Sequence, residues 1–242
     1  MVSFASDIHG LHGGGHFRCR RPRHRRERRM SASEEIVFLV DDDARVREAI
    51  GELLASMGWR AETFARAADY VSYPRPDVPA CLILDVELPD VSGLEFQKRV
   101  SQQDHPPIVF ITGHGDIPSS VRAIQRGAVD FLTKPVRDDD LLAAVRAAID
   151  RDRILRAARA EQAELRRRFA ALTPREREVL PLVVSGLLNK QAAAELGISE
   201  ITLQIHRSKI MQKMQAASLP DLVRIAEKLD IPVTHCRRSG NP

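Results

Sequence analysis

The sequence predicts an α/β domain built on a five-stranded parallel sheet, followed by a small all-α domain of four helices. Three observations lead to this fold class. Five short apolar runs alternate with amphipathic helical stretches between residues 35 and 150, which is typical of a parallel sheet covered on both faces. The helical pattern then continues without Gly or Pro to about residue 171. Beyond it, Gly and Ser separate four short helical stretches.

The alternating part of the chain predicts the elements of the first domain, at residues 34–150. Its strands are expected at Ile36–Val40, Ala61–Phe64, Cys81–Leu84, Ile108–Ile111 and Asp130–Leu132. Its helices are expected near residues 44–57, 66–73, 93–102, 119–126 and 138–150. Ligands of such sheets gather at the carboxyl ends of the strands, so the residues that follow each strand are the candidates for a functional site.

Residues 151–171 are predicted to form a helical linker. Six residues follow a 3-4 spacing that is only partly apolar: Leu155, Ala158, Gln162, Leu165, Phe169 and Leu172. A coiled-coil dimer along this seam is an alternative. Two heptads with a Gln in the seam favour a single amphipathic helix instead.

The second domain is predicted over residues 172–234, with a tail at 235–242. Thr173-Pro174-Arg175-Glu176 is a capping box with Pro at the first helical position, so a helix begins there and ends before Gly186. Three more helices are expected at about 189–196, 200–214 and 218–229, with Gly197, Ser199 and Ser218 at their boundaries. A helix, a tight turn and a helix bearing polar side chains indicate a helix-turn-helix.

Composition fits globular domains in a reducing compartment. The 242 residues are 43% hydrophobic and 29% charged, and no apolar run approaches the roughly 18 residues that a membrane span needs. The three cysteines, Cys19, Cys81 and Cys236, are odd in number and far apart. This spacing argues against a disulfide framework or a CxxC metal site, and it suits the cytoplasm.

Residues 1–33 are predicted to be a disordered basic extension. The first 30 residues hold eight arginines against Asp7 and Glu27, so the net charge of +4 comes from this segment. It has no periodicity and lacks the apolar stretch of a signal peptide. A nucleic-acid-binding arm is one alternative, and Met30-Ser31 favours another, a start codon assigned too early. A third is a metal cluster of five residues, His9, His12, His16, Cys19 and His24, whose spacing fits zinc patterns poorly.

Polar residues mark the ends of four predicted strands. The first strand ends in Asp41-Asp42-Asp43, the third in Asp85 and the fourth in Thr112, while Lys134-Pro135 follows the fifth. Carboxylates brought together raise one another's pKa unless a cation lies among them, and oxygen ligands select a hard ion such as Mg²⁺. A carboxylate beside Mg²⁺ can accept a phosphoryl group, with a lysine and a hydroxyl stabilising the transferred oxygens. Each residue alone is more often a turn, cap or core residue, but four in this order predict a phosphoryl-transfer site.

Residues 34–150 resemble a receiver domain, through FLVDDD, ILDVELPDVSG, VFITGHGD and GAVDFLTKP. The resemblance implies a flavodoxin-like sheet and a phosphoacceptor at Asp85. The implied Mg²⁺ ligands are Asp41, Asp42, Asp85 and the backbone carbonyl of Glu87. It further implies that Thr112 and Lys134 sense the phosphoryl group, that Phe131 is the switch aromatic, and that the Lys134–Pro135 bond is cis. Such a protein catalyses only its own phosphoryl transfer and dephosphorylation, and is not otherwise an enzyme.

Residues 172–230 resemble a LuxR-type DNA-binding domain, through LTPREREVL, GLLNKQAAAELGIS and ITLQIHRSKIMQKM. The resemblance makes Glu200–Met214 the recognition helix, with Gln204, Ile205 and Ser208 facing base edges. Phosphate contacts are implied for Lys190, His206, Arg207 and Lys209, although His206 could instead be structural. Positions 204 and 208 are often basic in relatives, and the neutral residues here point to a different operator. Packing in the core is expected for Ile201, Leu203, Ile210 and Met214.

A receiver followed by this domain is the arrangement of NarL/FixJ-type response regulators, and GHGD at Gly113–Asp116 and SLPDLVRIA at Ser218–Ala226 indicate the FixJ side. The resemblance implies a two-component response regulator in which a histidine kinase phosphorylates Asp85. Phosphorylation would draw Thr112 toward the new oxygens and free space for Phe131, changing the face that forms a homodimer on promoter DNA. RNA polymerase is a further candidate partner.

Two other classes of protein share part of this pattern. A phosphatase of the haloacid-dehalogenase type also uses an aspartyl nucleophile, but that family places DxDx[TV] after its first strand, whereas this strand ends in DDDAR. The other is a phospho-regulated protein-interaction module whose helix-turn-helix no longer reads DNA. The neutral recognition positions leave that alternative open.

Overall fold

The computed structural model describes residues 35–100, 105–113 and 117–232. The basic extension with its proposed arm or metal cluster, the C-terminal tail and part of the GHGD stretch lie outside these residues. Among the described helices, none combines the length and apolar content that crossing a bilayer requires.

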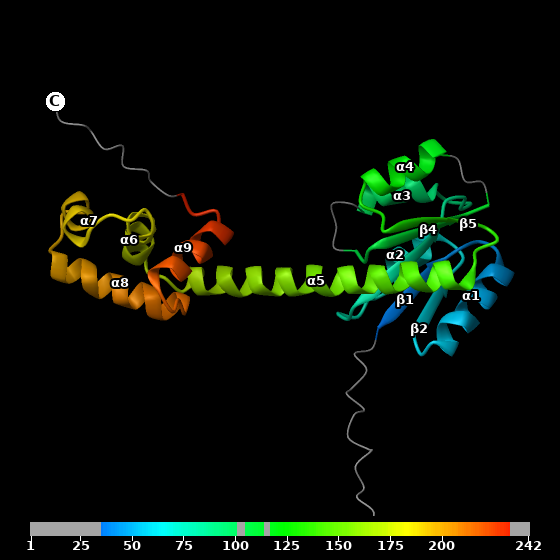
Figure 1. Ribbon diagram of the computed structural model, residues 1–242, viewed down its shortest axis with the longest axis horizontal. Coiled ribbons are helices and arrows are strands. Elements are labelled where there is room, and N and C mark those ends of the chain that lie inside the picture. The colour runs from blue at the N-terminus through cyan, green and yellow to red at the C-terminus, as the bar shows by residue number, and fades with distance from the viewer. Residues whose placement is uncertain (1–34, 101–104, 114–116, 233–242) are drawn as a thin grey trace, which may run out of the picture. The chain divides into compact units, whose positions relative to one another are not determined.

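The first domain is built on one parallel sheet (Figure 1). Its strands are β1 (Ile36–Val40), β2 (Arg60–Phe64), β3 (Ala80–Asp85), β4 (Ile108–Thr112) and β5 (Asp130–Thr133). Their order is β2-β1-β3-β4-β5, and every neighbouring pair is parallel. Each predicted strand lies within one residue of these bounds. The chain moves to opposite sides of β1 for β2 and β3, and such a switch point is where open parallel sheets bind ligands.

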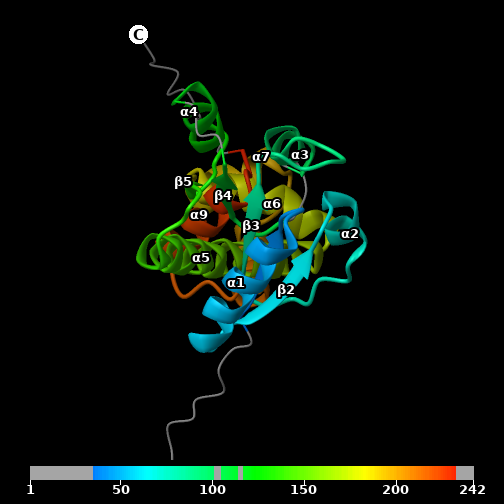
Figure 2. The same cartoon turned by 90° about the vertical axis from the view of Figure 1, so that its right-hand side faces the viewer.

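Helices cover both faces of this sheet (Figure 2). They are α1 (Ala44–Ser56), α2 (Ala67–Ser72), α3 (Gly93–Val100), α4 (Ile117–Gln125) and α5 (Asp138–Ala170). Residues of α1 and α5 pack in one core, and residues of α2, α3 and α4 in the other. Because both faces are covered, every position of β1, β3 and β4 is buried, which explains why these strands read as continuous apolar runs.

The predicted helix near 138–150 and the predicted linker form one helix, α5, of 33 residues. Its first turn carries Asp138, Asp139 and Asp140, and its last turn carries Arg167 and Arg168. Negative charge near the N-terminus of a helix and positive charge near its C-terminus interact favourably with the helix dipole and stabilise the helix. Leu165 and Leu172 are buried in the core of the second domain, and Phe169 packs against it. These three positions of the seam therefore pack within the chain, whereas the other three, Leu155, Ala158 and Gln162, are exposed.

Asp152 of α5 is a buried acid that the sequence analysis did not single out. Its Oδ2 accepts hydrogen bonds from the backbone N–H of Ala80, at 2.9 Å, and from Nε of Arg156, at 2.6 Å. Arg156 also pairs with Asp77. These contacts extend the packing of α5 on the sheet domain beyond residue 150. An acid three residues after Ile149, on the apolar side of a helix, was the available signal.

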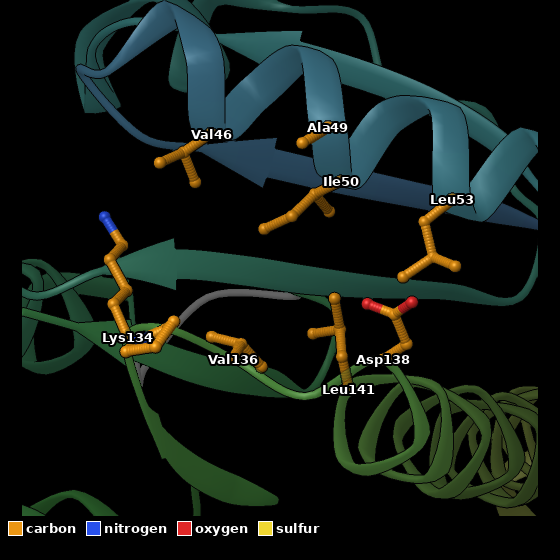
Figure 3. A pocket seen from close by; sticks show the side chains of 9 residues that line it. Val46, Ala49, Ile50, Leu53, Lys134, Val136, Asp138 and Leu141 are labelled. Atoms are coloured by element: carbon orange, nitrogen blue, oxygen red, sulfur yellow. The ribbon is translucent and has the colours of Figure 1, made fainter.

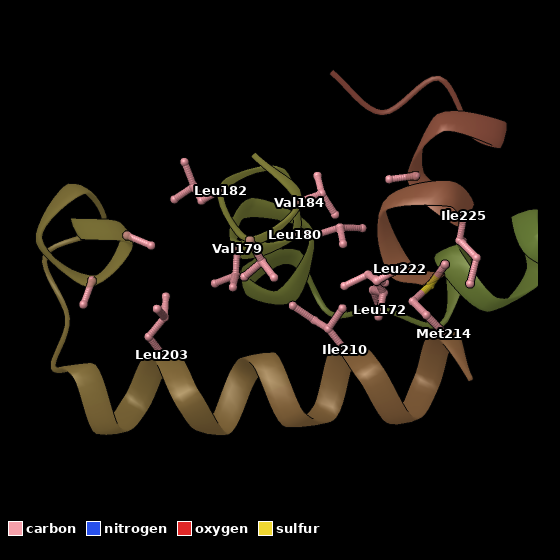
Figure 4. Packing of buried hydrophobic residues seen from close by; sticks show 14 of the residues in the cluster. Leu172, Val179, Leu180, Leu182, Val184, Leu203, Ile210, Met214, Leu222 and Ile225 are labelled. Carbon is pink, nitrogen blue, oxygen red and sulfur yellow. The ribbon is translucent and has the colours of Figure 1, made fainter. Parts of the chain in front are cut away.

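The second domain consists of α6 (Pro174–Val184), α7 (Asn189–Glu195), α8 (Glu200–Met214) and α9 (Leu219–Lys228). The predicted capping box is present, with Thr173 and Glu176 bonding to each other's backbone. Ser199 and Ser218 cap α8 and α9 as predicted. Figure 4 shows the core, in which α6, α8 and α9 each contribute large aliphatic side chains: Val179, Leu180, Leu203, Ile210, Met214, Leu222 and Ile225.

One expected core residue of α8 is misassigned. Leu203, Ile210 and Met214 are fully buried as predicted, but Ile201 is 73% exposed. Residues two positions apart on a helix do not share a face, so Ile201 cannot point the same way as Leu203. Its prediction as a core residue is wrong.

Glu176 of α6 is buried and binds Nζ of Lys213, on α8, at 2.6 Å. Burial alone would raise the pKa of this carboxyl, but the bonds from Lys213 and Thr173 outweigh it and lower the pKa below its ordinary value. An acid whose pKa is lower in the folded state stabilises the fold above its unfolded pKa, about 4.3, and loses that contribution as the pH falls through its folded pKa.

We therefore predict that Glu176→Gln makes unfolding of the second domain less dependent on pH below about pH 5. Urea unfolding monitored by circular dichroism at several pH values measures this dependence. Glu178→Gln is the matched control, since Glu178 lies exposed on the same helix and should leave the pH dependence nearly unchanged. Equal pH profiles for wild type and Glu176→Gln would contradict the prediction.

Candidate functional site

The predicted acidic cluster is present at the carboxyl edge of the sheet. Asp41 follows β1 and Asp85 ends β3, and these strands are neighbours. Carboxylate oxygens of Asp41, Asp42 and Asp85 all lie within 4.8 Å of one another. Asp41 and Asp85 are buried, whereas Asp42 is exposed. The cluster is therefore held by the sheet on one side and reachable from solvent on the other.

Lys134, which follows β5, reaches across to both buried acids. Its Nζ lies 2.6 Å from Oδ2 of Asp41 and 2.6 Å from Oδ2 of Asp85. The Lys134–Pro135 bond is cis, as the resemblance implied. One ammonium group thus forms ion pairs with two carboxylates that lie at the ends of separate strands.

Each buried acid is also held by a backbone N–H. Oδ1 of Asp41 accepts from Asp43 at 2.9 Å, and Oδ1 of Asp85 accepts from Glu87 at 3.1 Å. The latter bond places Glu87, whose carbonyl was implied as a metal ligand, in the turn directly beside the cluster. Both carboxylates are therefore fixed in orientation before any ligand binds.

The cluster contains three carboxylates but only one lysine among the described residues. Burial raises the pKa of Asp41, and the nearby charge of Asp85 adds to this, although the bonds from Lys134 and Asp43 act in the opposite direction. For Lys134, burial by itself lowers the pKa, but the hydrogen bonds to Asp41 and Asp85 outweigh it and raise the pKa above its ordinary value. Lys134 accordingly stays an ammonium. Three carboxylates around one lysine still leave room for a divalent cation.

The donor set fits Mg²⁺. Asp41, Asp42 and Asp85 offer only oxygen ligands, and Mg²⁺ in proteins is bound through one or two carboxylates, together with waters and phosphate oxygens. Because Asp42 is exposed, waters and a phosphoryl group can share the same side of the cluster.

Thr112 and Phe131 lie on the strands next to Asp85. Thr112 ends β4 and is fully buried, and its backbone carbonyl accepts from the Lys134 N–H at 2.7 Å. Phe131 of β5 is half-buried and packs beside Phe110, with 6.0 Å between ring centroids. Strand alternation places Thr112, Phe110 and Phe131 on the face covered by α2, α3 and α4. The structure thus brings the predicted hydroxyl and aromatic together on one side of the sheet.

An apolar pocket of about 510 Å³ adjoins the cluster, between α1 and the start of α5 (Figure 3). Val46, Ile50 and Leu53 line it from α1, and Val136 and Leu141 line it opposite. Lys134 belongs to both the pocket and the cluster. Its side chain is 22% exposed, so part of this lysine is not enclosed by protein.

Gly93, at the start of α3, lies against the backbone of Asp85, a contact that the sequence analysis missed. A Cβ at this position would lie 2.3 Å from the backbone oxygen of Asp85. We predict that Gly93→Ala displaces α3 or β3 and destabilises the domain by about 3 kcal/mol. Urea unfolding would measure the loss.

Gly51→Ala is the matched control for this substitution. Gly51 lies in the interior of α1, where a Cβ would meet only the Thr63 methyl at 3.9 Å. Removing a helical glycine should stabilise the domain by roughly 0.5–1 kcal/mol. A loss of similar size in both variants would contradict the role assigned to Gly93.

The predicted DNA-contacting residues divide into two groups by exposure. Gln204, Ile205, Ser208 and Lys209 of α8, and Lys190 of α7, are exposed. His206 and Arg207 are half-buried. Nη1 of Arg207 donates to Oδ1 of Asn189 at 3.1 Å, which joins α8 to the first turn of α7. Nδ1 of His206 is buried and has no hydrogen-bond partner among the described residues.

An acidic cluster paired with a lysine at the carboxyl edge of a parallel sheet, and an exposed helix of a helix-turn-helix in the same chain, are typical of signalling proteins that act on DNA. Comparison with known families agrees with this class. Residues 37–146 match the response regulator receiver domain, and residues 170–226 match the luxR family of bacterial regulatory proteins. The chain belongs to the family of two-component response regulators that join a receiver domain to a LuxR-type DNA-binding domain.

Individual relatives support the same assignment. Nodulation protein W of Bradyrhizobium diazoefficiens is 48% identical over 210 residues, which are 86% of this chain and 92% of that protein. The transcriptional regulatory protein FixJ of Azorhizobium caulinodans is 41% identical over 191 residues, covering 78% and 90%. The solved structure of the response regulator StyR is 45% identical, with a TM-score of 0.72, covering 81% of this chain and 99% of that one. The FixJ-type architecture expected from the sequence is confirmed.

Proposed function

We propose that Asp85 accepts a phosphoryl group from a cognate sensor histidine kinase, and that this event controls homodimerisation and sequence-specific binding to promoter DNA. The observation that carries the proposal is the pairing of Lys134 with both Asp41 and Asp85 beside an exposed Asp42. This arrangement combines a fixed nucleophile, a cation for the transferred oxygens and an open side for the donor.

In the transfer step, Oδ of Asp85 attacks the phosphorus of a phosphohistidine. The bond from phosphorus to the imidazole nitrogen breaks, a P–O bond to Asp85 forms, and the imidazole takes up a proton. We propose Asp41, Asp42, Asp85 and the backbone carbonyl of Glu87 as the Mg²⁺ ligands, and the ion would neutralise charge on the transferred oxygens. Hydrolysis of the same P–O bond, by water, would return the protein to its resting state.

Phosphorylation would then change the face formed by α4 and β5. We propose that Lys134 moves from the carboxylates to the phosphoryl oxygens and that Thr112 donates to them, which opens space for Phe131. Three apolar side chains on α4 support a dimer contact there. Ile117, Val121 and Ile124 are 79%, 47% and 46% exposed and lie on one side of the helix, so the described protomer leaves a large part of each one uncovered.

The second domain is proposed to bind promoter DNA through α8, with Lys190 and Lys209 contacting phosphates and Gln204, Ile205 and Ser208 facing bases. A supporting role at the α7–α8 junction is proposed for Arg207, since it is bonded to Asn189. The expected setting is the bacterial cytoplasm, where promoter DNA and RNA polymerase are found.

A salt titration of DNA binding by the phosphorylated full-length protein tests this function. A regulator that contacts several phosphates should lose affinity steeply, as a linear fall of log K with log salt concentration. Lys209→Ala should weaken binding and reduce the slope by roughly one. Binding that is absent at low salt would favour the alternative, a protein-interaction module.

A further inference from the structure

The outward side of α8 carries a pair of isoleucines that no part of the described protomer covers. Ile201 is 73% exposed, and Ile205, one turn later, is 50% exposed. Residues four apart share a side of a helix. The exposed Ser208 and Gln212 continue the same side toward the end of α8, opposite the side that packs in the core. The pair is therefore an apolar patch at the N-terminal half of an otherwise polar surface.

This position is the one from which a recognition helix reads bases. In a helix-turn-helix, the N-terminal residues of the second helix contact base edges in the major groove. On the side of the helix that carries the two isoleucines, the described exposed side chains in this half are Ile201, Gln204, Ile205 and Ser208, and none of them is charged; the exposed Glu200 lies in the first turn, beside this side. Cations are found on α8 at Arg207, Lys209 and Lys213, against the one acid Glu200, so the helix as a whole is attracted to a polyanion.

The chemistry of these four side chains selects particular bases. Guanine is most often read by a bidentate Arg or Lys, and no such residue is present in this set. An isoleucine cannot donate or accept a hydrogen bond. The apolar group that a base pair presents in the major groove is the C5-methyl of thymine, and Gln pairs in bidentate fashion with adenine N6 and N7.

We propose that Ile201 and Ile205 read thymine methyl groups, so that the operator carries A·T pairs beneath the N-terminal half of α8. This inference rests on the proposed DNA-binding function and deepens it by naming the bases. Ile201 is thereby a specificity residue one turn earlier than the family resemblance placed any base contact.

The test begins by selecting bound sequences from a random duplex pool, using the full-length protein treated with acetyl phosphate and Mg²⁺. Each thymine of the selected site is then replaced in turn by deoxyuridine, which removes only the methyl group. Affinity should fall about fourfold at two positions in each half-site, the ratio that corresponds to one methylene-sized apolar group. Thymines elsewhere should show a ratio near one.

Protein variants assign each methyl group to its side chain. Ile201→Ala should abolish the thymine-to-uracil difference at one position and Ile205→Ala at the other, because the smaller side chain no longer reaches the methyl. Gln212→Ala is the matched control, since Gln212 is exposed on the same side of α8 in its C-terminal half. Gln212→Ala should keep the thymine-to-uracil affinity difference at both positions. Lys209→Ala should keep both as well, because it weakens binding to all sequences equally.

The possible failures are distinguishable. A selected site that tolerates uracil at every thymine, or differences that persist in both isoleucine variants, would overturn this inference while leaving DNA binding intact. A pool without any enriched sequence would overturn the proposed function as well. If Ile201→Ala or Ile205→Ala instead weakens dimerisation in the absence of DNA, measured by sedimentation velocity, the patch is a contact between protein chains and the inference is wrong.

Discussion

Asp85→Asn is expected to abolish phosphorylation of the protein completely. Asp85 ends β3 with its Oδ2 2.6 Å from Lys134 Nζ and its Oδ1 held by the Glu87 N–H. An amide of the same size can accept only one of these two bonds, and it lacks the nucleophilic carboxylate. Incubation with acetyl phosphate and Mg²⁺, followed by intact-protein mass spectrometry, should show one added phosphoryl group on the wild type and none on the variant. Phosphorylation-driven dimerisation should disappear with it.

A matched variant in the same turn separates chemistry from folding. Asp90 is exposed, and its Oδ2 accepts from the backbone N–H of Ala68 at the start of α2. Asp90→Asn should therefore be labelled like the wild type. Unchanged circular dichroism spectra for both variants would establish intact folds. Label retained on Asp85→Asn would mean that another residue is the acceptor.

Lys134→Ala is expected to lower the free energy of unfolding of the receiver and to weaken its dimerisation upon phosphorylation. The substitution removes two bonds of 2.6 Å and leaves Asp41 and Asp85 side by side without their cation. Removing one partner of a buried ion pair typically destabilises by 3–5 kcal/mol, and the partial exposure of Lys134 places the expected loss at about 3 kcal/mol. Urea unfolding measures this loss. Dimerisation upon phosphorylation should also weaken, because no ammonium remains to follow the phosphoryl group.

Lys98→Ala serves as the comparison for this substitution. Lys98 is an exposed lysine of α3 whose ion pair with Glu95, at 3.6 Å, contributes little. Its loss should change the free energy of unfolding by at most about 0.5 kcal/mol. If the two alanine variants are equally stable and both dimerise normally, Lys134 has neither role.

Local signals in the sequence were sufficient for most of the fold. The Thr173–Glu176 capping box involves residues three apart, and the start of α6 was predicted from it. The strands were predicted from continuous apolar runs, because a sheet covered on both faces leaves no polar side to interrupt them. Ile201 was misassigned although helical periodicity excludes it from the side of Leu203.

The acidic site could be predicted in its residues but not in its bonds. Asp41, Asp85, Thr112 and Lys134 follow strands, and parallel topology brings the ends of strands to one edge. Whether Lys134 bonds to one acid, to both or to neither depends on side-chain reach across β1, β3 and β5. No local pattern in the sequence encodes that reach.

The partners in contacts between segments distant in sequence could not be predicted from the sequence. Asp152 meets Ala80, Glu176 meets Lys213, and Gly93 touches the backbone of Asp85. Each depends on how elements pack after they form. The glycine in particular looks like an ordinary turn residue in the sequence, and only the position of its absent Cβ reveals the constraint.

The central claim is that the phosphoryl group on Asp85 governs the oligomeric state and the DNA affinity together. Its most direct test is to follow one sample of the full-length protein, before and after treatment with acetyl phosphate and Mg²⁺, by sedimentation velocity and by fluorescence anisotropy with its selected operator. We expect the phosphorylated fraction of the wild type to sediment as a dimer and to bind the operator more tightly, with neither change in Asp85→Asn. Equal operator affinity and an unchanged sedimentation coefficient, in a wild-type sample that mass spectrometry shows to be phosphorylated, would contradict it.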